Sequence, residues 1–339
     1  MKAKKLPSGN WRCRVYSHTD STGKKIYESF TASTKTQAQS MAAKYADSIE
    51  KRRAKDITVK EAVHSYLLAN ENVLSPSTLY NYKSDAKKFE SINHIKVRKL
   101  SSSDIQTLIS ELVSRGLSPK SIRNVYGLLH AVLAFSDVET NFKVHLPSVQ
   151  KVKQKAPENE QIKVLYEAAS HHMKIAIMLA AFHSLRRGEI CGLTYGDLKG
   201  NVLYIHSDMV KSSDGHSWVH KQVPKTSVSN RYVYLTEQEL ELIGQGDPED
   251  YIVPLVPNSI GTNFDRLKKR TGVNIRFHDL RVYFASISAS MGIPEMVTAH
   301  HGGWKEGSKV LSEHYHRPIQ SIDEGYANKL NEYFKKEVL

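Results

Sequence analysis

Helix-start signals and helical apolar spacing fill the segment between residues 57 and 140, and this regularity constrains the fold more than any other feature. Thr58 and Glu61 have the spacing of a capping box, in which each side chain accepts from the other residue's backbone N–H. A proline directly after a capping serine is typical of the first helical position. The residues expected to open helices are Thr58, Ser75, Ser102 or Ser103, and Ser118. We therefore predict a compact bundle of four short helices.

The first 33 residues have a different period, because apolar and polar side chains alternate there. Every second residue from Trp11 to Val15 is apolar, so one face of a strand can pack against a core. The positions between and after them carry basic or aromatic side chains: Arg12, Arg14 and Tyr16. Turn signals at residues 8–10 and 20–23 separate the runs, which predicts a three-stranded sheet. A helix capped by Thr34 or Thr36 is expected to follow.

The remainder of the chain combines a linker with mixed structure. Residues 143–157 hold prolines and lysines without an apolar period, which indicates an extended basic linker. Beyond it, residues 201–209 and 218–224 are strand-like, and residues 231–235 are expected to return as a hairpin. Helical spacing fills most of the rest and predicts a tail helix at the end of the chain.

These patterns together predict a multidomain α+β protein. Its predicted parts are a small N-terminal three-stranded sheet plus helix (residues 1–55), a four-helix bundle (56–142), a linker (143–157), and a mixed, mainly helical domain with a small antiparallel sheet (158–339).

Positive charge is concentrated at the front of this chain. The formal net charge is +13 at pH 7, and residues 1–55 hold 13 Lys and Arg against 4 Asp and Glu. Residues 56–156 hold 14 against 9, whereas residues 157–339 hold 21 against 22. A basic N-terminal part followed by a neutral C-terminal part indicates polyanion-binding modules attached to a catalytic domain. The alternative is a basic protein without such a partner, since net charge also serves solubility.

The sequence also lacks the marks of several protein classes. No apolar run reaches the roughly 18 residues that span a bilayer, and the basic N-terminus has no apolar signal-peptide core. Cys13 and Cys191 lie far apart, which gives neither a disulfide framework nor a zinc pattern. We therefore expect a cytoplasmic protein without a membrane partner.

Two arginines and a histidine indicate a site for a phosphate group. His278 and Arg281 are three residues apart, so on a helix they lie about 60° apart on one face. Arg186 has the same spacing to Glu189, whose carboxylate can orient the guanidinium. Two arginines from different elements can clamp a phosphate and stabilise the charge that develops when it is attacked. Each arginine taken alone is more often a structural ion pair.

Three further residues can complete chemistry at such a phosphate. Lys225, beside the expected hairpin turn, can protonate a leaving oxygen, and Trp304 offers an indole N–H donor. A phenol such as that of Tyr315 needs nearby cations to become a competent nucleophile. No set of Cys, His or carboxylate residues with metal-ligand spacing accompanies them, so we expect neither a metal nor a cofactor.

The ordered motifs resemble those of the tyrosine recombinases, specifically the integrases of phages and conjugative transposons. Leu185-Arg186-Arg187-Gly188-Glu189-Ile190 is similar to their first arginine box, and Val223-Pro224-Lys225-Thr226 to their hairpin lysine segment. His278-Asp279-Leu280-Arg281 resembles their second box. Gly303-Trp304 and Tyr315-His316 match the positions of the hydrogen-bond donor and of the nucleophile.

The resemblance covers nearly the whole chain and implies a site-specific recombinase that inserts and excises a mobile element. Tyr315 would form a 3′-phosphotyrosine and release a 5′-hydroxyl, which would reseal the strand after exchange, without ATP or metal. Four protomers would assemble on double-stranded DNA with core and arm sites, aided by DNA-bending and directionality proteins. Residues 1–55 look like an arm-type DNA-binding domain and residues 56–142 like a core-binding domain. The expected DNA contacts are Arg12, Arg14, Tyr16, Lys24, Lys25, Lys151 and Lys153.

Several alternatives stay open. A type IB topoisomerase shares the phosphotyrosine chemistry, and an inactive DNA-binding regulator could use the same scaffold. The sequence departs from the family pattern at His183-Ser184, where Thr-Gly is common, and at Ala299-His300-His301-Gly302. His300 and His301 therefore compete with Trp304 for the donor position. The tail helix could dock on its own domain or on a neighbouring protomer, and its tyrosines Tyr326 and Tyr333 compete with Tyr315 as the nucleophile.

Overall fold

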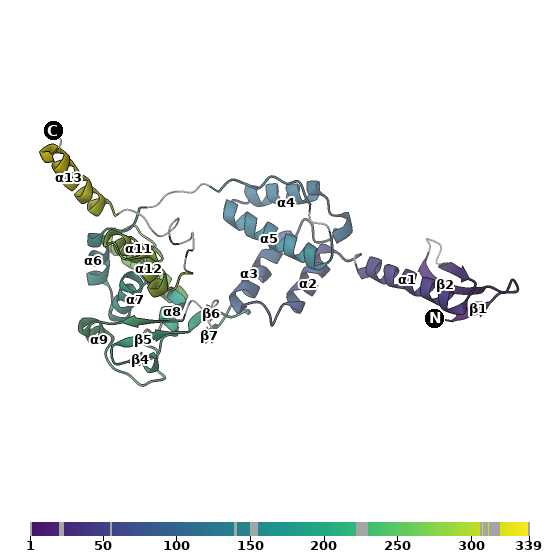
Figure 1. Cartoon of the computed structure of the whole chain (residues 1–339), viewed down its shortest axis with the longest axis horizontal. Coiled ribbons are helices and arrows are strands. Elements are labelled where there is room, and N and C mark those ends of the chain that lie inside the picture. The colour runs from purple at the N-terminus through teal and green to yellow at the C-terminus, as the bar shows by residue number, and fades with distance from the viewer. Residues whose placement is uncertain are drawn as a thin grey trace. The chain divides into compact units, whose positions relative to one another are not determined.

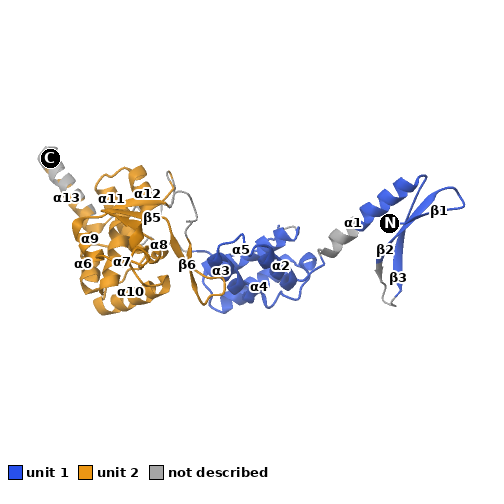
Figure 2. Ribbon diagram, turned by 90° about the horizontal axis from the view of Figure 1, so that it is seen from below, with its two compact units in different colours: residues 1–150 blue, residues 151–339 orange. Residues whose placement is uncertain are grey.

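The computed structural model describes residues 2–19, 24–54, 56–138, 141–149, 155–221, 230–305, 307, 311 and 319–337. Helices and sheets are mixed in these residues, as predicted (Figure 1). The chain divides into two compact units, residues 1–150 and residues 151–339 (Figure 2). No helix in the described ranges is long and apolar enough to cross a bilayer.

An antiparallel three-stranded sheet begins the first unit. Its strands lie in the order β1-β2-β3 and are followed by α1: β1 (Ala3–Lys5), β2 (Trp11–Thr19), β3 (Lys25–Ala32) and α1 (Lys35–Ala54). Cys13 of β2 is fully buried against Ala38 and Ala42 of α1, whereas Arg12 and Arg14 are exposed. The predicted alternation along this strand is therefore confirmed. The second predicted turn, at residues 20–23, lies outside the described residues.

Among its described residues, the first unit continues with four α-helices and two short 3-10 turns. They are α2 (Val59–Ala69), α3 (Pro76–Ala86), η1 (Lys87–Phe89), η2 (Val97–Lys99), α4 (Ser102–Ser114) and α5 (Pro119–Phe135). The capping box of Thr58 and Glu61 is present, and Ser75 and Ser118 cap the helices that begin with proline. Helix α4 begins at Ser102, one of the two predicted residues, and its cap is Ser101, whose Oγ accepts from the Asp104 N–H at 3.2 Å. A short polar residue before a helix competes with its neighbours for this role, and spacing alone did not separate them.

The second unit packs eight helices and five strands, counted over its described residues. The helices are α6 (Asn159–Ala168), α7 (His171–Phe182), α8 (Arg187–Gly192), α9 (Glu237–Ile243), α10 (Pro257–Thr271), α11 (Asp279–Ser290), α12 (Glu295–Gly302) and α13 (Gln320–Glu337). The strands, with one 3-10 turn, are η3 (Tyr195–Asp197), β4 (Leu198–Lys199), β5 (Val202–Ile205), β6 (Asp208–Lys211), β7 (Trp218–Lys221) and β8 (Arg231–Tyr234).

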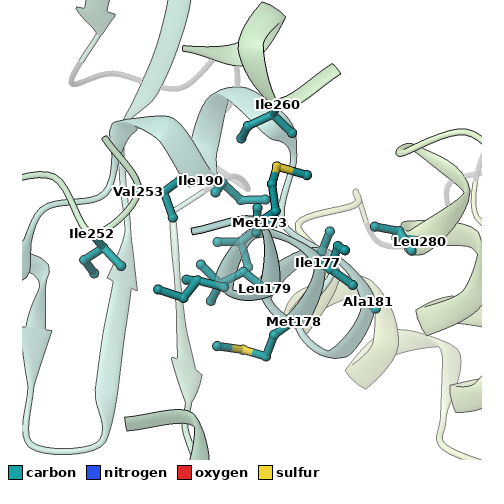
Figure 3. Close-up of a cluster of buried hydrophobic side chains, with 14 of the residues drawn as sticks. Met173, Ile177, Met178, Leu179, Ala181, Ile190, Ile252, Val253, Ile260 and Leu280 are labelled. Atoms are coloured by element: carbon teal, nitrogen blue, oxygen red, sulfur yellow. The ribbon is translucent and has the colours of Figure 1, made fainter. Parts of the chain in front are cut away.

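Helix α7 forms the centre of this unit. Its sequence is apolar on every face, and residues 175–181 are all buried, as a helix surrounded by others requires. Helices α6, α8, α9, α10 and α11 all contact it. Ile190 of α8 and Leu280 of α11 belong to the same buried cluster (Figure 3). Their polar sequence neighbours, Glu189 and Arg281, are therefore held in place by the core.

The pairing of the strands differs from the prediction. Strands β6 and β7 pair with each other, whereas β8 pairs with β5 in a sheet of order β4-β5-β8. The expected return of residues 231–235 along the preceding strand was therefore wrong. The predicted strand 201–209 is also broken, since Ser207 turns inward and donates to the Gly192 carbonyl at 3.0 Å. A buried serine needs such a partner, and satisfying it interrupts the strand.

The first turn of α13 docks on its own domain. Glu158 accepts from the Gln320 N–H at 2.9 Å and from Ser321 Oγ at 2.6 Å. Ile319, directly before the helix, is buried with Ala156 and Val282. The beginning of the tail helix is thus attached in cis, beside the point where the predicted linker enters this unit.

Candidate active site

Arg186 occupies a sharp connection between α7 and α8. Ser184 has a φ of 59°, a left-handed conformation that turns the chain after α7. Arg186 then precedes α8 with extended backbone, so it is a helix cap rather than a helical residue. Its N–H donates to Glu189 Oε2 at 2.8 Å, and its Nη1 donates to Glu189 Oε1 at 2.6 Å. The predicted pairing of Arg186 with Glu189 is therefore present, through both backbone and side chain.

Glu189 is a buried carboxylate shared by two arginines. It is 4% exposed, and Arg231 of β8 donates to it through Nη2 at 3.0 Å and Nη1 at 3.4 Å. Burial opposes ionisation, but the charges of Arg231 and then Arg186 outweigh it and lower the pKa of Glu189 to about 2. Glu189 is therefore an anion throughout the physiological range.

The carboxyl end of α12 holds three guanidinium groups on three consecutive carbonyl oxygens. Arg231 Nε donates to the His301 carbonyl at 2.8 Å, and Arg281 Nη2 to the Gly302 carbonyl at 3.2 Å. Arg186 Nη2 donates to the next carbonyl, that of Gly303, at 3.2 Å. The last carbonyls of a helix lack intrahelical partners and carry partial negative charge, so they favour cations. This helix end gathers arginines from three separate segments.

Two glycines make this close approach possible. Gly303 has a φ of 68°, and a Cβ there would lie 2.8 Å from Arg231 Nη1. A Cβ on Gly302 would lie 1.9 Å from the Trp304 ring. Both distances are shorter than real contacts, so larger residues would push Arg231 or Trp304 out of position.

Arg281 and Trp304 contact each other in the interior. Arg281 is 1% exposed, and its guanidinium carbon lies 4.6 Å from the centroid of the Trp304 ring, a cation–π contact. His301 instead faces His183, with 3.3 Å between Nε2 and Nδ1, and His300 is exposed. The geometry therefore favours Trp304 over the two histidines as the residue beside Arg281.

His278 directly precedes α11, one turn before Arg281. Desolvation of its ring, followed by the positive charge of Arg281, lowers the pKa of His278 to about 4. A neutral imidazole at pH 7 can accept or donate a hydrogen bond at a reacting oxygen. No group of three side chains suited to a metal ion occurs in the described part of the chain.

The sequence did not predict Arg231 as part of this site. Strand β8 alternates, and Arg231 lies on the same face as the buried Val233. A charged residue in the apolar register of a strand is a signal that could have identified it. The structure thus brings together Arg186, Glu189, Arg281 and Trp304, with Arg231 added. Lys225, Tyr315, Lys151 and Lys153 lie outside the described residues, and their roles stay predictions.

The basic face predicted for the N-terminal sheet is also visible. Arg14 lies over the ring of Tyr27, with 5.0 Å from its guanidinium carbon to the centroid, and Tyr16 meets the same ring edge-on at 5.7 Å. Arg12 is exposed beside them, and so are Lys24 and Lys25 at the start of β3. Arg12, Arg14 and Tyr16 lie on the face of β2 opposite to Cys13.

Comparison with known proteins agrees with this fold. The profile of the "Phage integrase family" matches residues 157–320, and that of the "Phage integrase, N-terminal SAM-like domain" matches residues 58–113. The Tn1549 transposon integrase in complex with transposon right end DNA has a similar structure, with a TM-score of 0.64 and 18% identity over 81% of this chain and 100% of that one. A lambda integrase dimer bound to a core site gives a TM-score of 0.59 and 16% identity over 93% and 94%.

Curated relatives point the same way. A "Tyrosine recombinase XerC-like" protein of Caldanaerobacter subterraneus subsp. tengcongensis is 24% identical over 56% of this chain and 53% of its own length. The integrase of Salmonella phage P22 is 23% identical over 58% and 51%. The chain therefore spans about half the length of the curated relatives it matches.

The fold and the arginine site together define a scaffold of the tyrosine recombinase class. More specifically, two phage integrase profiles match the helical bundle and the second unit in order, and with the integrase relatives they identify the chain as a tyrosine recombinase.

Proposed function

We propose that the chain is a site-specific DNA recombinase, which integrates and excises a mobile element by cutting and rejoining DNA through a 3′-phosphotyrosine. The observation that carries the proposal is the placement of Arg186 and Arg281 on adjacent carbonyls, those of Gly303 and Gly302. Two guanidinium groups held this close can bind the two non-bridging oxygens of one phosphate. They would stabilise the charge of the five-coordinate transition state.

The roles of the remaining residues follow from their chemistry. The Tyr315 oxygen would attack phosphorus, and the bond from phosphorus to the 5′ oxygen would break, with Lys225 giving that oxygen a proton. His278, neutral at pH 7, would take the phenolic proton, and Trp304 would support the phosphate through its indole N–H. The new ester keeps the free energy of the broken bond, so the proposed reaction needs neither ATP nor a metal.

Access to the arginines is unequal. The Arg186 side chain is 40% exposed, so a phosphate arriving from solvent meets it first. Arg281 is buried beside Trp304, so we expect DNA binding to uncover it. A site completed only on DNA would protect the nucleophile from unproductive reactions.

The resemblance to the integrases implies a separate role for each part of the chain. Residues 1–55 would bind arm sites and residues 56–142 core sites on double-stranded DNA, with residues 143–157 as the linker and 158–339 as the catalytic domain. A lambda integrase tetramer bound to a Holliday junction is similar over 92% of this chain with a TM-score of 0.58, which supports a homotetramer here. We also propose that DNA-bending and directionality proteins assist the recombinase, and that it acts in the cytoplasm.

A suicide substrate tests the proposal. The full chain is incubated with nicked duplexes made from the DNA that flanks its gene, and protein–DNA adducts are resolved after denaturation. We expect an adduct with the wild type and none with Tyr315→Phe. An adduct that survives in Tyr315→Phe would assign the nucleophile elsewhere. Relaxation of any supercoiled plasmid without site preference would instead indicate a topoisomerase, and binding without any adduct would indicate a DNA-binding regulator.

A further inference from the structure

We propose that Arg231 is a positioning residue for this reaction, which fixes Glu189 and the end of α12 so that Arg186 is aimed at the phosphate. This inference rests on the proposed function. Arg231 is 1% exposed and begins β8, so it belongs to neither of the two arginine boxes in the sequence.

The donors of Arg231 are directed at protein acceptors. Its Nε donates to the His301 carbonyl at 2.8 Å, its Nη2 to Glu189 Oε2 at 3.0 Å, and its Nη1 to Glu189 Oε1 at 3.4 Å. A guanidinium engaged on both edges and closed to solvent does not offer a phosphate a free pair of N–H groups. Arg231 therefore acts through its partners.

Glu189 transmits this constraint to Arg186. The same oxygen, Oε1, accepts from Arg186 Nη1 at 2.6 Å and from Arg231 Nη1 at 3.4 Å. The two contacts of Arg231 fix the plane of the carboxylate, and that plane sets the direction of the partly exposed Arg186 side chain. The His301 contact also fixes the helix end whose next carbonyls hold Arg281 and Arg186. One buried side chain thus ties three elements together: β8, α8 and α12.

Removal of the cation gives a specific signature. Without Arg231, Glu189 keeps its burial but loses the positive charge that contributes most to holding it ionised. Protonation of Glu189 would then begin at mildly acidic pH and release Arg186. A merely structural role would lower activity by the same factor at every pH.

The rate of adduct formation on the nicked suicide duplex is therefore measured from pH 5 to pH 8 for wild type, Arg231→Met and Arg231→Lys. We expect Arg231→Met to form the adduct about 10- to 100-fold more slowly than wild type at pH 8, and to fall further behind wild type at pH 5. Arg231→Lys should have an intermediate rate. In a Glu189→Gln background, Arg231→Met should add less than about threefold, because the two residues act as a unit. Arg266→Met, on the exposed face of α10, is the matched control and should match wild type.

The proposal would be overturned if Arg231→Met slowed adduct formation by the same factor at every pH, and if this factor multiplied the loss of rate that Glu189→Gln causes. A second readout does not depend on activity: the Glu189 carboxyl is followed by 13C NMR during an acid titration. We expect it to titrate at higher pH in Arg231→Met than in the wild type, with Arg231→Lys in between, and an unchanged titration in Arg231→Met would also overturn the proposal. If the wild type forms no adduct on any substrate while this shift is present, the proposed function fails, whereas the constraint that Arg231 places on Glu189 is still shown.

Discussion

The same residue type is used in opposite ways in the N-terminal sheet and in the second unit. Arg12 and Arg14 are exposed on one strand, and Arg14 lies over an aromatic ring. Arg231 and Arg281 are each 1% exposed and bonded to backbone carbonyls. Exposed charges act over a distance and are screened by salt, whereas buried charges depend on their hydrogen bonds.

This difference separates affinity from chemistry. An exposed arginine can be lost for a fraction of a kcal/mol, while removing one partner of a buried pair costs about 3–5 kcal/mol. We therefore expect the sheet to govern how tightly DNA is held, and the arginines of the second unit to govern whether it is cut.

The largest expected effect is on cleavage. Arg186→Gln and Arg281→Gln should each lower the rate of adduct formation by about 10²- to 10³-fold, because each removes charge stabilisation in the transition state. DNA affinity, measured by fluorescence anisotropy on the same duplex, should stay within about threefold of wild type. If DNA affinity fell by as large a factor as the cleavage rate, these arginines would bind DNA as the sheet is expected to do. The proposed difference between the two regions would then be wrong.

The next effect is on stability. Gly303→Ala should lower the free energy of unfolding by about 1–3 kcal/mol in urea, because alanine strains a φ of 68° and meets Arg231 at 2.8 Å. Gly272→Ala is the matched control, since its φ is 74° but a Cβ there meets nothing within 4 Å. If both variants lost the same free energy of unfolding and cleaved DNA at the wild-type rate, the packing of Arg231 against Gly303 would not matter for cleavage.

A salt titration addresses the exposed region. Arg12→Ala together with Arg14→Ala should make the plot of log affinity against log salt shallower by about 2, since each phosphate contact contributes about 0.9. Cleavage at saturating protein should not change. An unchanged slope would remove these two arginines from the DNA interface, and a loss of cleavage at saturation would give the sheet a role in chemistry.

Buried histidines should make the stability of the second unit depend on pH. Burial, with nearby positive charge, lowers the pKa of His301 and of His278 to about 4, from 6.5. Between about pH 6.5 and pH 4 the unfolded chain binds protons that these folded histidines do not, so the free energy of unfolding should fall as the pH falls through this window. His301→Gln should weaken this dependence in urea titrations at pH 7 and pH 4.5. A dependence as steep as wild type would show that His301 contributes nothing to it.

The smallest effect is expected at Ser184. Its φ is 59°, it is fully buried, and its hydroxyl has no hydrogen-bond partner among the described residues. Ser184→Gly should therefore raise the free energy of unfolding by about 1 kcal/mol, by removing backbone strain and an unsatisfied polar group. Thermal unfolding measures this change, and a lower free energy of unfolding in Ser184→Gly would mean that the hydroxyl stabilises the fold.

Local features of this chain could be predicted from its sequence, and non-local ones could not. The capping box at Thr58 and the contact of Arg186 with Glu189 depend on residues three apart, where spacing fixes geometry. The pairing of β8 with β5 was missed, because alternation identifies a strand but not its partner. Arg231 was missed for the same reason, since its partners lie 42 and 70 residues away in the chain.

Backbone acceptors are a second limit. The carbonyls that hold the three arginines carry no side-chain signature, so no motif reveals them. Only the glycines at 302 and 303 mark the place, and their role becomes visible once a Cβ is placed against Arg231 and Trp304. The contact of Arg281 with Trp304 was expected only through the order of the family's motifs.

The most direct test is a crystal structure of the full chain trapped on a nicked suicide duplex. The account predicts a phosphate linked to Tyr315, with guanidinium nitrogens of both Arg186 and Arg281 about 2.7–3.1 Å from its non-bridging oxygens, and Arg231 still bound to Glu189. A linked phosphate bound by other residues, with Arg186 and Arg281 still directed at the carbonyls of α12, would contradict it.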